Sequence, residues 1–207
     1  MRFRLILFDL DGTLADSLPW FRSILRELAP RHGLRLLDDA EFEAFRELDN
    51  REIIRRLGVP SWRLPLIAQD MRRLAARDAG TIGLFPGVPE MLRALREAGR
   101  VLAVVSSNSE ANARRILGAS AAEVAWFGCG ASLFGKAARF RQVLRRAALP
   151  AETAIAVGDE LRDLHAAAEA GLSAAAVTWG YATRSALAGA GPLLVFDRPE
   201  EIAARLP

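Results

Sequence analysis

Polar residues that suit catalysis follow the apolar runs of this 207-residue chain. Asp9 and Asp11 come directly after the run at 5–8, and Asp163 stands one helical turn beyond Asp159. The residues that end an apolar run or open the helix after it are Asp9, Asp11, Ser106, Ser107, Asn108, Lys136, Asp159 and Asp163. Because the carboxyl ends of parallel strands meet at one edge of a sheet, we expect these side chains to lie close together.

The carboxylates in this group predict a bound divalent cation. Several carboxylates at one strand edge repel one another, and each is driven to protonate unless a cation neutralises them. The two histidines, His32 and His165, and the one cysteine, Cys129, form no cluster along the sequence, which argues against zinc. Oxygen ligands with a phosphate as co-ligand favour Mg²⁺ as the cofactor.

The elements that position these residues predict an α/β fold. Short, fully apolar runs are typical of strands in a parallel sheet that is covered on both faces. Such runs occur at 5–8, 101–105, 154–157, 174–177 and 193–196, and stretches with helical spacing occur at 89–98, 110–117, 136–148 and 161–170. The fold class is therefore a doubly wound parallel sheet, a Rossmann-like core.

One long helical insert interrupts this alternation. After the first run no further strand is expected before residue 101, and residues 16–83 have the spacing of helices, the third of which has Pro65 near its first turn. We expect a catalytic core at 1–15 and 84–207 and a small helical domain at 16–83.

The composition argues against nucleic-acid and membrane partners and favours a reducing compartment. The net charge of +3 gives no sign of a nucleic-acid partner, and no apolar run reaches the roughly 20 residues that span a membrane. A single cysteine cannot form an internal disulfide, so we expect a cytoplasmic protein. We also expect a monomer or a homodimer. Lys136 is the only lysine of the chain, and every other basic residue is arginine.

Four motifs in order resemble one enzyme family. They are the string Asp9-Leu10-Asp11-Gly12-Thr13-Leu14, Ser106, Lys136 and the string from Gly158 to Asp163. Together they resemble the haloacid dehalogenase superfamily of hydrolases. The helical insert and the segment LFPGVPEML after it are similar to the phosphoglycolate phosphatase-like branch, whose insert is a cap.

The resemblance implies an Mg²⁺-dependent phosphatase acting on a small phosphorylated metabolite. Asp9 would attack phosphorus to form an aspartyl-phosphate, and Asp11 would serve as acid and then as base. Ser106 and Lys136 would stabilise the phosphoryl group. The implied metal ligands are Asp9, the Asp11 carbonyl, Asp159 and Asp163, and the expected substrate contacts are Ser107, Asn108 and Arg51, with Trp20, Phe21, Arg46 and Trp62 as further cap candidates.

Some alternatives stay open at this level. A β-phosphoglucomutase-like mutase would keep the same core residues, whereas Asp11 argues against a dehalogenase and the insert against a receiver domain. Ser107 competes with Ser106 for the same role. Asp163 is either a metal ligand or a structural partner, for example of Thr13 or of a backbone amide, and Glu160 is expected to be solvated.

Overall fold

The computed structural model describes residues 3–132 and 135–206, so residues 1–2, 133–134 and 207 of the predicted core lie outside it. Within the described residues, six parallel strands form one sheet in the order β3-β2-β1-β4-β5-β6. The strands are β1 (Leu5–Phe8), β2 (Val101–Val104), β3 (Trp126–Phe127), β4 (Ala154–Gly158), β5 (Ser173–Val177) and β6 (Leu194–Phe196). The predicted α/β fold is confirmed, and β3 is an edge strand that the sequence pattern did not indicate.

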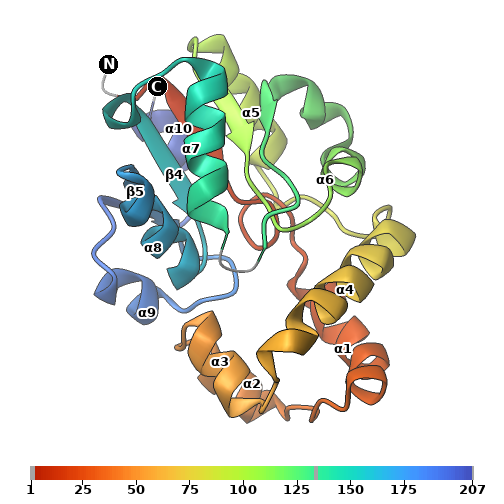
Figure 1. The fold of residues 1–207 in the computed structure, drawn as a ribbon. Coiled ribbons are helices and arrows are strands. Elements are labelled where there is room, and N and C mark those ends of the chain that lie inside the picture. The colour runs from red at the N-terminus through yellow and green to blue at the C-terminus, as the bar shows by residue number, and fades with distance from the viewer. Residues whose placement is uncertain (1–2, 133–134, 207) are drawn as a thin grey trace.

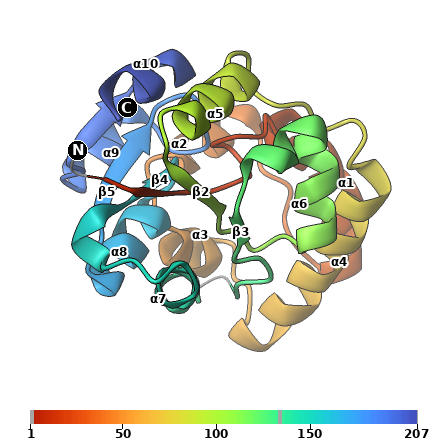
Figure 2. The same cartoon turned by 90° about the horizontal axis from the view of Figure 1, so that it is seen from above.

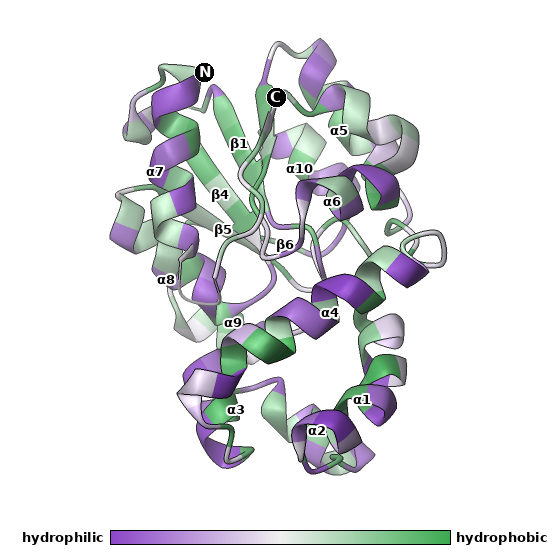
Figure 3. Cartoon of the chain, turned by 45° about the vertical axis from the view of Figure 1, so that its right-hand side comes forward, coloured by the Kyte–Doolittle hydropathy of each residue, from purple (hydrophilic) through white to green (hydrophobic). Residues whose placement is uncertain are grey.

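Helices cover both faces of the sheet (Figure 2). They are α5 (Val88–Glu97), α6 (Glu110–Leu117), α7 (Lys136–Ala147), α8 (Leu161–Ala170), α9 (Arg184–Gly189) and α10 (Pro199–Arg205), joined in part by the 3₁₀ turns η2 (Gly118–Glu123) and η3 (Ala151–Thr153). Helices α5 and α10 lie together on one face, and α7 and α8 lie together on the other. The strands are hydrophobic along their length, whereas hydrophilic residues are frequent on the helices (Figure 3).

Alternation along β1 decides which face each side chain meets. Ile6 and Phe8 belong to the core cluster under α5 and α10, while Leu5 and Leu7 belong to the cluster under α7 and α8. Asp9 is two residues beyond Leu7, so the alternation directs it toward α7 and α8. These are the two helices that carry Lys136 and Asp163.

The insert consists of helices that lie beyond the carboxyl ends of the strands (Figure 1). They are α1 (Leu18–His32), α2 (Asp39–Phe45), α3 (Asn50–Arg56), the 3₁₀ turn η1 (Ser61–Arg63) and α4 (Leu64–Asp78). Pro65 occupies the first turn of α4, where its missing N–H costs no helical hydrogen bond. Buried Ile24, Leu28 and Leu74 join α1 to α4.

Two adjacent connections attach the insert to the sheet. Ala15 and Leu84 form an antiparallel bridge, and the Phe85 N–H donates to the Leu14 carbonyl at 3.0 Å. The chain therefore leaves the core and returns to it at the same place. Across residues 3–132 and 135–206, no helix combines the length and the apolar character that crossing a membrane requires.

Candidate active site

The strand register brings the predicted residues to one edge of the sheet. Phe8 is level with Val104 of β2 and with Val157 of β4. Asp9, Ser106 and Asp159 follow these three strands, and all three are buried. The predicted residues that follow these three strands therefore lie at one edge of the sheet.

A tight turn after β1 shapes the floor of the site. The Leu14 and Ala15 N–H groups both donate to the Leu10 carbonyl, and Gly12 has the positive φ of 85° that this turn requires. The turn directs the Thr13 hydroxyl to Oδ1 of Asp159 at 2.6 Å. Thr13 is thus paired with Asp159, and not with Asp163 as one of the sequence alternatives supposed.

Asp159 is held from its other side by the loop after β5. The Tyr181 N–H donates to Oδ2 of Asp159 at 2.8 Å. Gly12 and Gly180 approach so closely that a Cβ at either position would stand within 2.3 Å of that same oxygen. The orientation of this carboxylate is therefore fixed by two hydrogen bonds and by steric enclosure.

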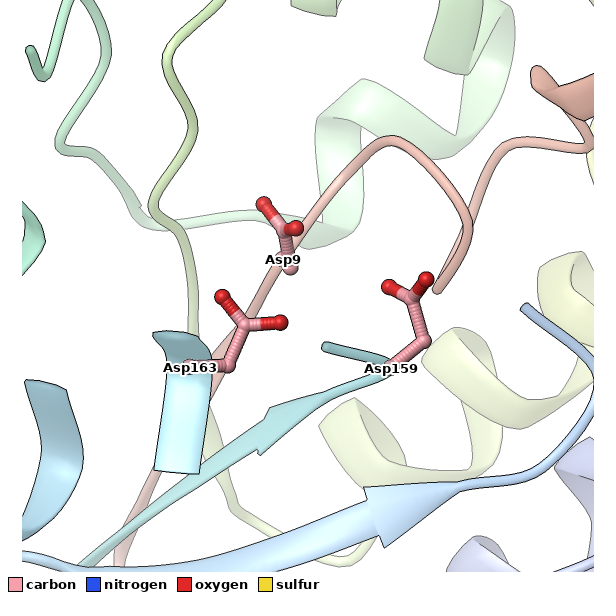
Figure 4. Close-up of side chains that lie close together, drawn as sticks. All are labelled: Asp9, Asp159 and Asp163. Atoms are coloured by element: carbon pink, nitrogen blue, oxygen red, sulfur yellow. The ribbon is translucent and has the colours of Figure 1, made fainter. Parts of the chain in front are cut away.

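Lys136 and Asp163 complete the buried group around Asp9. The Lys136 ammonium lies 2.8 Å from Oδ1 of Asp9 and 2.6 Å from Oδ1 of Asp163. Oδ2 of Asp163 accepts from the Glu160 N–H at 3.1 Å. Both oxygens of Asp163 thus have a protein partner, and the backbone-amide alternative describes one of them. Figure 4 shows the Asp9, Asp159 and Asp163 carboxylates facing a common space.

The electrostatics of the site leave an excess of negative charge. Burial raises the pKa of Asp9, although Lys136 acts against the shift. Burial, with Glu160 and Asp163 adding to it, raises the pKa of Asp159 well above its usual range. For Asp163 burial acts in the same direction, but Lys136 and Arg162 outweigh it and lower the pKa.

A divalent cation fits this donor set. Asp9, Asp159 and Asp163 each offer a carboxylate oxygen, and these atoms lie within 4.8 Å of one another. Oδ2 of Asp9 is buried and accepts no hydrogen bond from the residues that the structure describes. Oxygen-only donors in a buried, negatively charged group suit a hard cation such as Mg²⁺.

Asp11 has the properties of a group that exchanges protons. Burial, and after it the charge of Asp9, raises the pKa of Asp11 to about 6, while Ser17 and Asn108 lower it in part through hydrogen bonding. The Ser17 hydroxyl is itself 3.1 Å from the Tyr181 hydroxyl. A carboxyl group with this pKa can donate and accept a proton near neutral pH.

The loop after β2 carries Ser106 together with Ser107 and Asn108, two of the three residues predicted to contact substrate. The Ser106 hydroxyl is buried and accepts from the Asn108 N–H at 3.0 Å, while Ser107 is half-buried. The Asn112 amide donates to Oδ1 of Asn108 at 2.9 Å and fixes that side chain. The third predicted contact, Arg51, lies on α3 with an exposed side chain.

The insert touches the loop that positions Asp159. Nε of Arg46 donates to the Tyr181 carbonyl at 2.8 Å, and the Glu47 carboxylate accepts from the Thr183 hydroxyl at 2.6 Å. Phe21 packs edge-on against Tyr181, with ring centroids 5.8 Å apart. Arg46, a sequence candidate for substrate contact, therefore binds the core backbone.

The remaining aromatic candidates of the insert lie elsewhere. Nε1 of Trp20 donates to Oδ2 of Asp78 at 3.0 Å, within the insert. Trp62 is 66% exposed.

Sequence reasoning missed a partly buried ion pair. Glu160, expected to be solvated, is 14% exposed in its side chain, and its Oε1 lies 2.8 Å from Nη2 of Arg162. The expectation was wrong because the Glu160 carboxylate pairs with Arg162 beside Asp9 instead of extending into solvent. The only signal in the sequence was the position of both residues within the motif from Gly158 to Asp163.

Known proteins match the chain over almost its whole length. The model of the haloacid dehalogenase-like hydrolase family matches residues 6–177. A phosphoglycolate phosphatase from Synechococcus elongatus is 33% identical over 199 residues, which are 95% of this chain and 94% of that protein.

Solved structures match the chain as well. A haloacid dehalogenase-like family hydrolase from Streptococcus pneumoniae matches with a TM-score of 0.81 at 22% identity, over 99% of each chain. CbbY from Rhodobacter sphaeroides, solved in complex with phosphate, matches with a TM-score of 0.72 at 25% identity, over 97% of this chain and 96% of that one.

The fold and site define a parallel α/β protein with buried carboxylates, a lysine and a hydroxyl at the carboxyl edge of its sheet. The chain belongs to the haloacid dehalogenase-like hydrolase family, in its phosphoglycolate phosphatase-like branch. It is an enzyme, a phosphoric monoester hydrolase, and the resemblance seen in the sequence motifs is confirmed.

Proposed function

We propose that the enzyme hydrolyses a small phosphate monoester in an Mg²⁺-dependent reaction, with a transient aspartyl-phosphate on Asp9. The observation that carries this proposal is the asymmetry of the Asp9 carboxylate. Its Oδ1 is 2.8 Å from the Lys136 ammonium, while its buried Oδ2 accepts no hydrogen bond from the described residues. A desolvated carboxylate oxygen, oriented by a neighbouring cation, suits a nucleophile.

The protein groups around Asp9 account for both steps of such a reaction. Asp9 attacks phosphorus as the bond to the ester oxygen breaks, and Asp11 donates a proton to that leaving oxygen. Asp11 then takes a proton from the water that hydrolyses the aspartyl-phosphate, an exchange suited to its pKa of about 6. Lys136 and the Ser106 hydroxyl stabilise the negative charge on the phosphoryl oxygens.

The proposed ligands of Mg²⁺ are Asp9, the Asp11 carbonyl, Asp159 and Asp163. When bound, Mg²⁺ would supply positive charge that offsets the negative charge of the phosphoryl oxygens and of the buried carboxylates. Because Asp163 also binds Lys136 at 2.6 Å, it has a second proposed role, which is to hold that ammonium beside Asp9.

The proposed substrate is a small acid ester of the phosphoglycolate type. The similarity to the Synechococcus elongatus phosphoglycolate phosphatase supports this choice. We further propose that residues 16–83 act as a cap that excludes water from the site, with Arg51, Ser107 and Asn108 contacting the substrate.

A panel of phosphorylated metabolites with Mg²⁺ tests the proposal, on wild type and on Asp9→Asn. Acid-quenched wild type is expected to carry phosphate on Asp9, and phosphate release is expected to equal substrate loss. Asp9→Asn should lose both signals. Wild-type rates in Asp9→Asn would contradict the nucleophile, and isomerisation of a hexose phosphate without phosphate release would instead identify a mutase.

A further inference from the structure

Arg162 is a second cation beside the proposed nucleophile. It is the second residue of α8, and its side chain is 19% exposed. Its Nη2 lies 4.0 Å from Oδ2 of Asp9, the oxygen without a hydrogen-bond partner among the described residues. Lys136 faces the other oxygen of the same carboxylate. Asp9 is therefore flanked by one cation on each oxygen.

The position of Arg162 does not favour the stability of the fold. A helix carries partial positive charge at its N-terminus, so a cation in the first turn is disfavoured there. In addition, Nε of Arg162 is buried and has no acceptor among residues 3–132 and 135–206. A buried donor without an acceptor is destabilising until a ligand or neighbour supplies one.

Glu160 holds this arginine in place. Its Oε1 accepts from Nη2 of Arg162 at 2.8 Å, and both side chains are largely buried. The separation of 4.0 Å between Nη2 and Asp9 exceeds hydrogen-bond length, so Arg162 is close to Asp9 without being bonded to it. The guanidinium keeps unused donors on a fork that is suited to phosphoryl oxygens.

We propose that Arg162 is a catalytic residue that donates hydrogen bonds to a non-bridging oxygen of the transferring phosphoryl group, with Glu160 as its positioning residue. This inference rests on the proposed function. As the bond from Asp9 to phosphorus forms, the bond to the leaving oxygen breaks. Lys136 on one side and Arg162 on the other stabilise the negative charge on the non-bridging oxygens. The proton of the leaving oxygen still comes from Asp11, so Arg162 changes no covalent bond.

Binding of inorganic phosphate and orthovanadate with Mg²⁺ tests the inference without turnover. The variants are Arg162→Gln and Arg162→Lys, with exposed Arg93→Gln as the matched control. Arg162→Gln is expected to bind phosphate and vanadate at least about tenfold more weakly and to lose their stabilising effect on Tm. Arg162→Lys should recover part of this loss, and Arg93→Gln should behave as wild type. Unchanged affinity for both anions in a folded Arg162→Gln protein would overturn the inference.

A second variant separates positioning from folding. Glu160→Gln is expected to weaken vanadate binding less than Arg162→Gln, and to add no further loss in the double variant, because both act through one guanidinium. A lower Tm in both variants with wild-type vanadate affinity would assign the pair a structural role and overturn the proposal. Failure of acid-stable trapping on Asp9, with anion binding still dependent on Arg162, would instead contradict only the covalent intermediate.

Discussion

Alanine in place of Gly180 is expected to disable the site by steric pressure alone. The new Cβ would stand 2.3 Å from Oδ2 of Asp159 and 2.4 Å from the Gly12 carbonyl, and real Cβ contacts under 3.0 Å are essentially never seen. Asp159 or the loop must therefore shift by about 0.7 Å. A displacement approaching 1 Å in a catalytic group costs about 10²-fold in rate, and overpacking costs about 1–3 kcal/mol of stability.

The measurement is kcat/KM together with the Mg²⁺ dependence of Tm. Gly189→Ala is the matched control, because a Cβ there meets no atom within 4 Å. Gly180→Ala should lose about 10²-fold in kcat/KM and should need more Mg²⁺ for the same rise in Tm, while the control retains both. A Gly180→Ala enzyme within threefold of wild type would refute the argument that Asp159 must stay where it is.

Three further predictions concern charge, core and insert. Burial raises the pKa of Asp11 from 3.8 to about 6, so the folded chain keeps a proton that the unfolded chain releases. This contribution to stability is present below about pH 4 and is lost as the pH rises through 6. The ionised Asp11 carboxylate then adds negative charge beside the proposed Mg²⁺ site, so Mg²⁺ should raise Tm more at pH 8 than at pH 5. The reverse order in thermal melts would contradict the burial argument. Phe140→Ala removes a fully buried ring from α7 and should cost about 3–5 kcal/mol in urea unfolding, with a loss under 1 kcal/mol counting against the packing described. Arg46→Gln removes the hydrogen bonds to the Gly180 and Tyr181 carbonyls and should lower kcat/KM about tenfold, with a loss of stability of about 1 kcal/mol. Unchanged kinetics would show that this contact is not needed.

The sheet and most of its helices follow from the sequence because their signals are local. The apolar runs at 5–8 and 154–157 match β1 and β4 to within a residue, and 110–117 and 161–170 match α6 and α8. Strand β3 has only two residues, Trp126 and Phe127, which is too short for any periodic pattern. The edge of the sheet could be predicted since every strand runs in the same direction.

Contacts between side chains from separate elements could not be read in the same way. The position of Asp163 indicated the site but not that Lys136 occupies one of its oxygens. Glu160 was expected in solvent, and the sequence motif does not show that its carboxylate pairs with Arg162. The binding of Arg46 to the core backbone likewise depends on where the insert docks.

The two connections between the insert and the sheet, at residues 14–16 and 83–85, lie side by side and are hydrogen-bonded to each other. Since both ends of the helical unit are anchored at one point, a replacement of different length closes its loop there at little extra entropic cost. On the proposed function, such a replacement would change the residues that face the substrate and would leave the carboxylates at the strand ends in place.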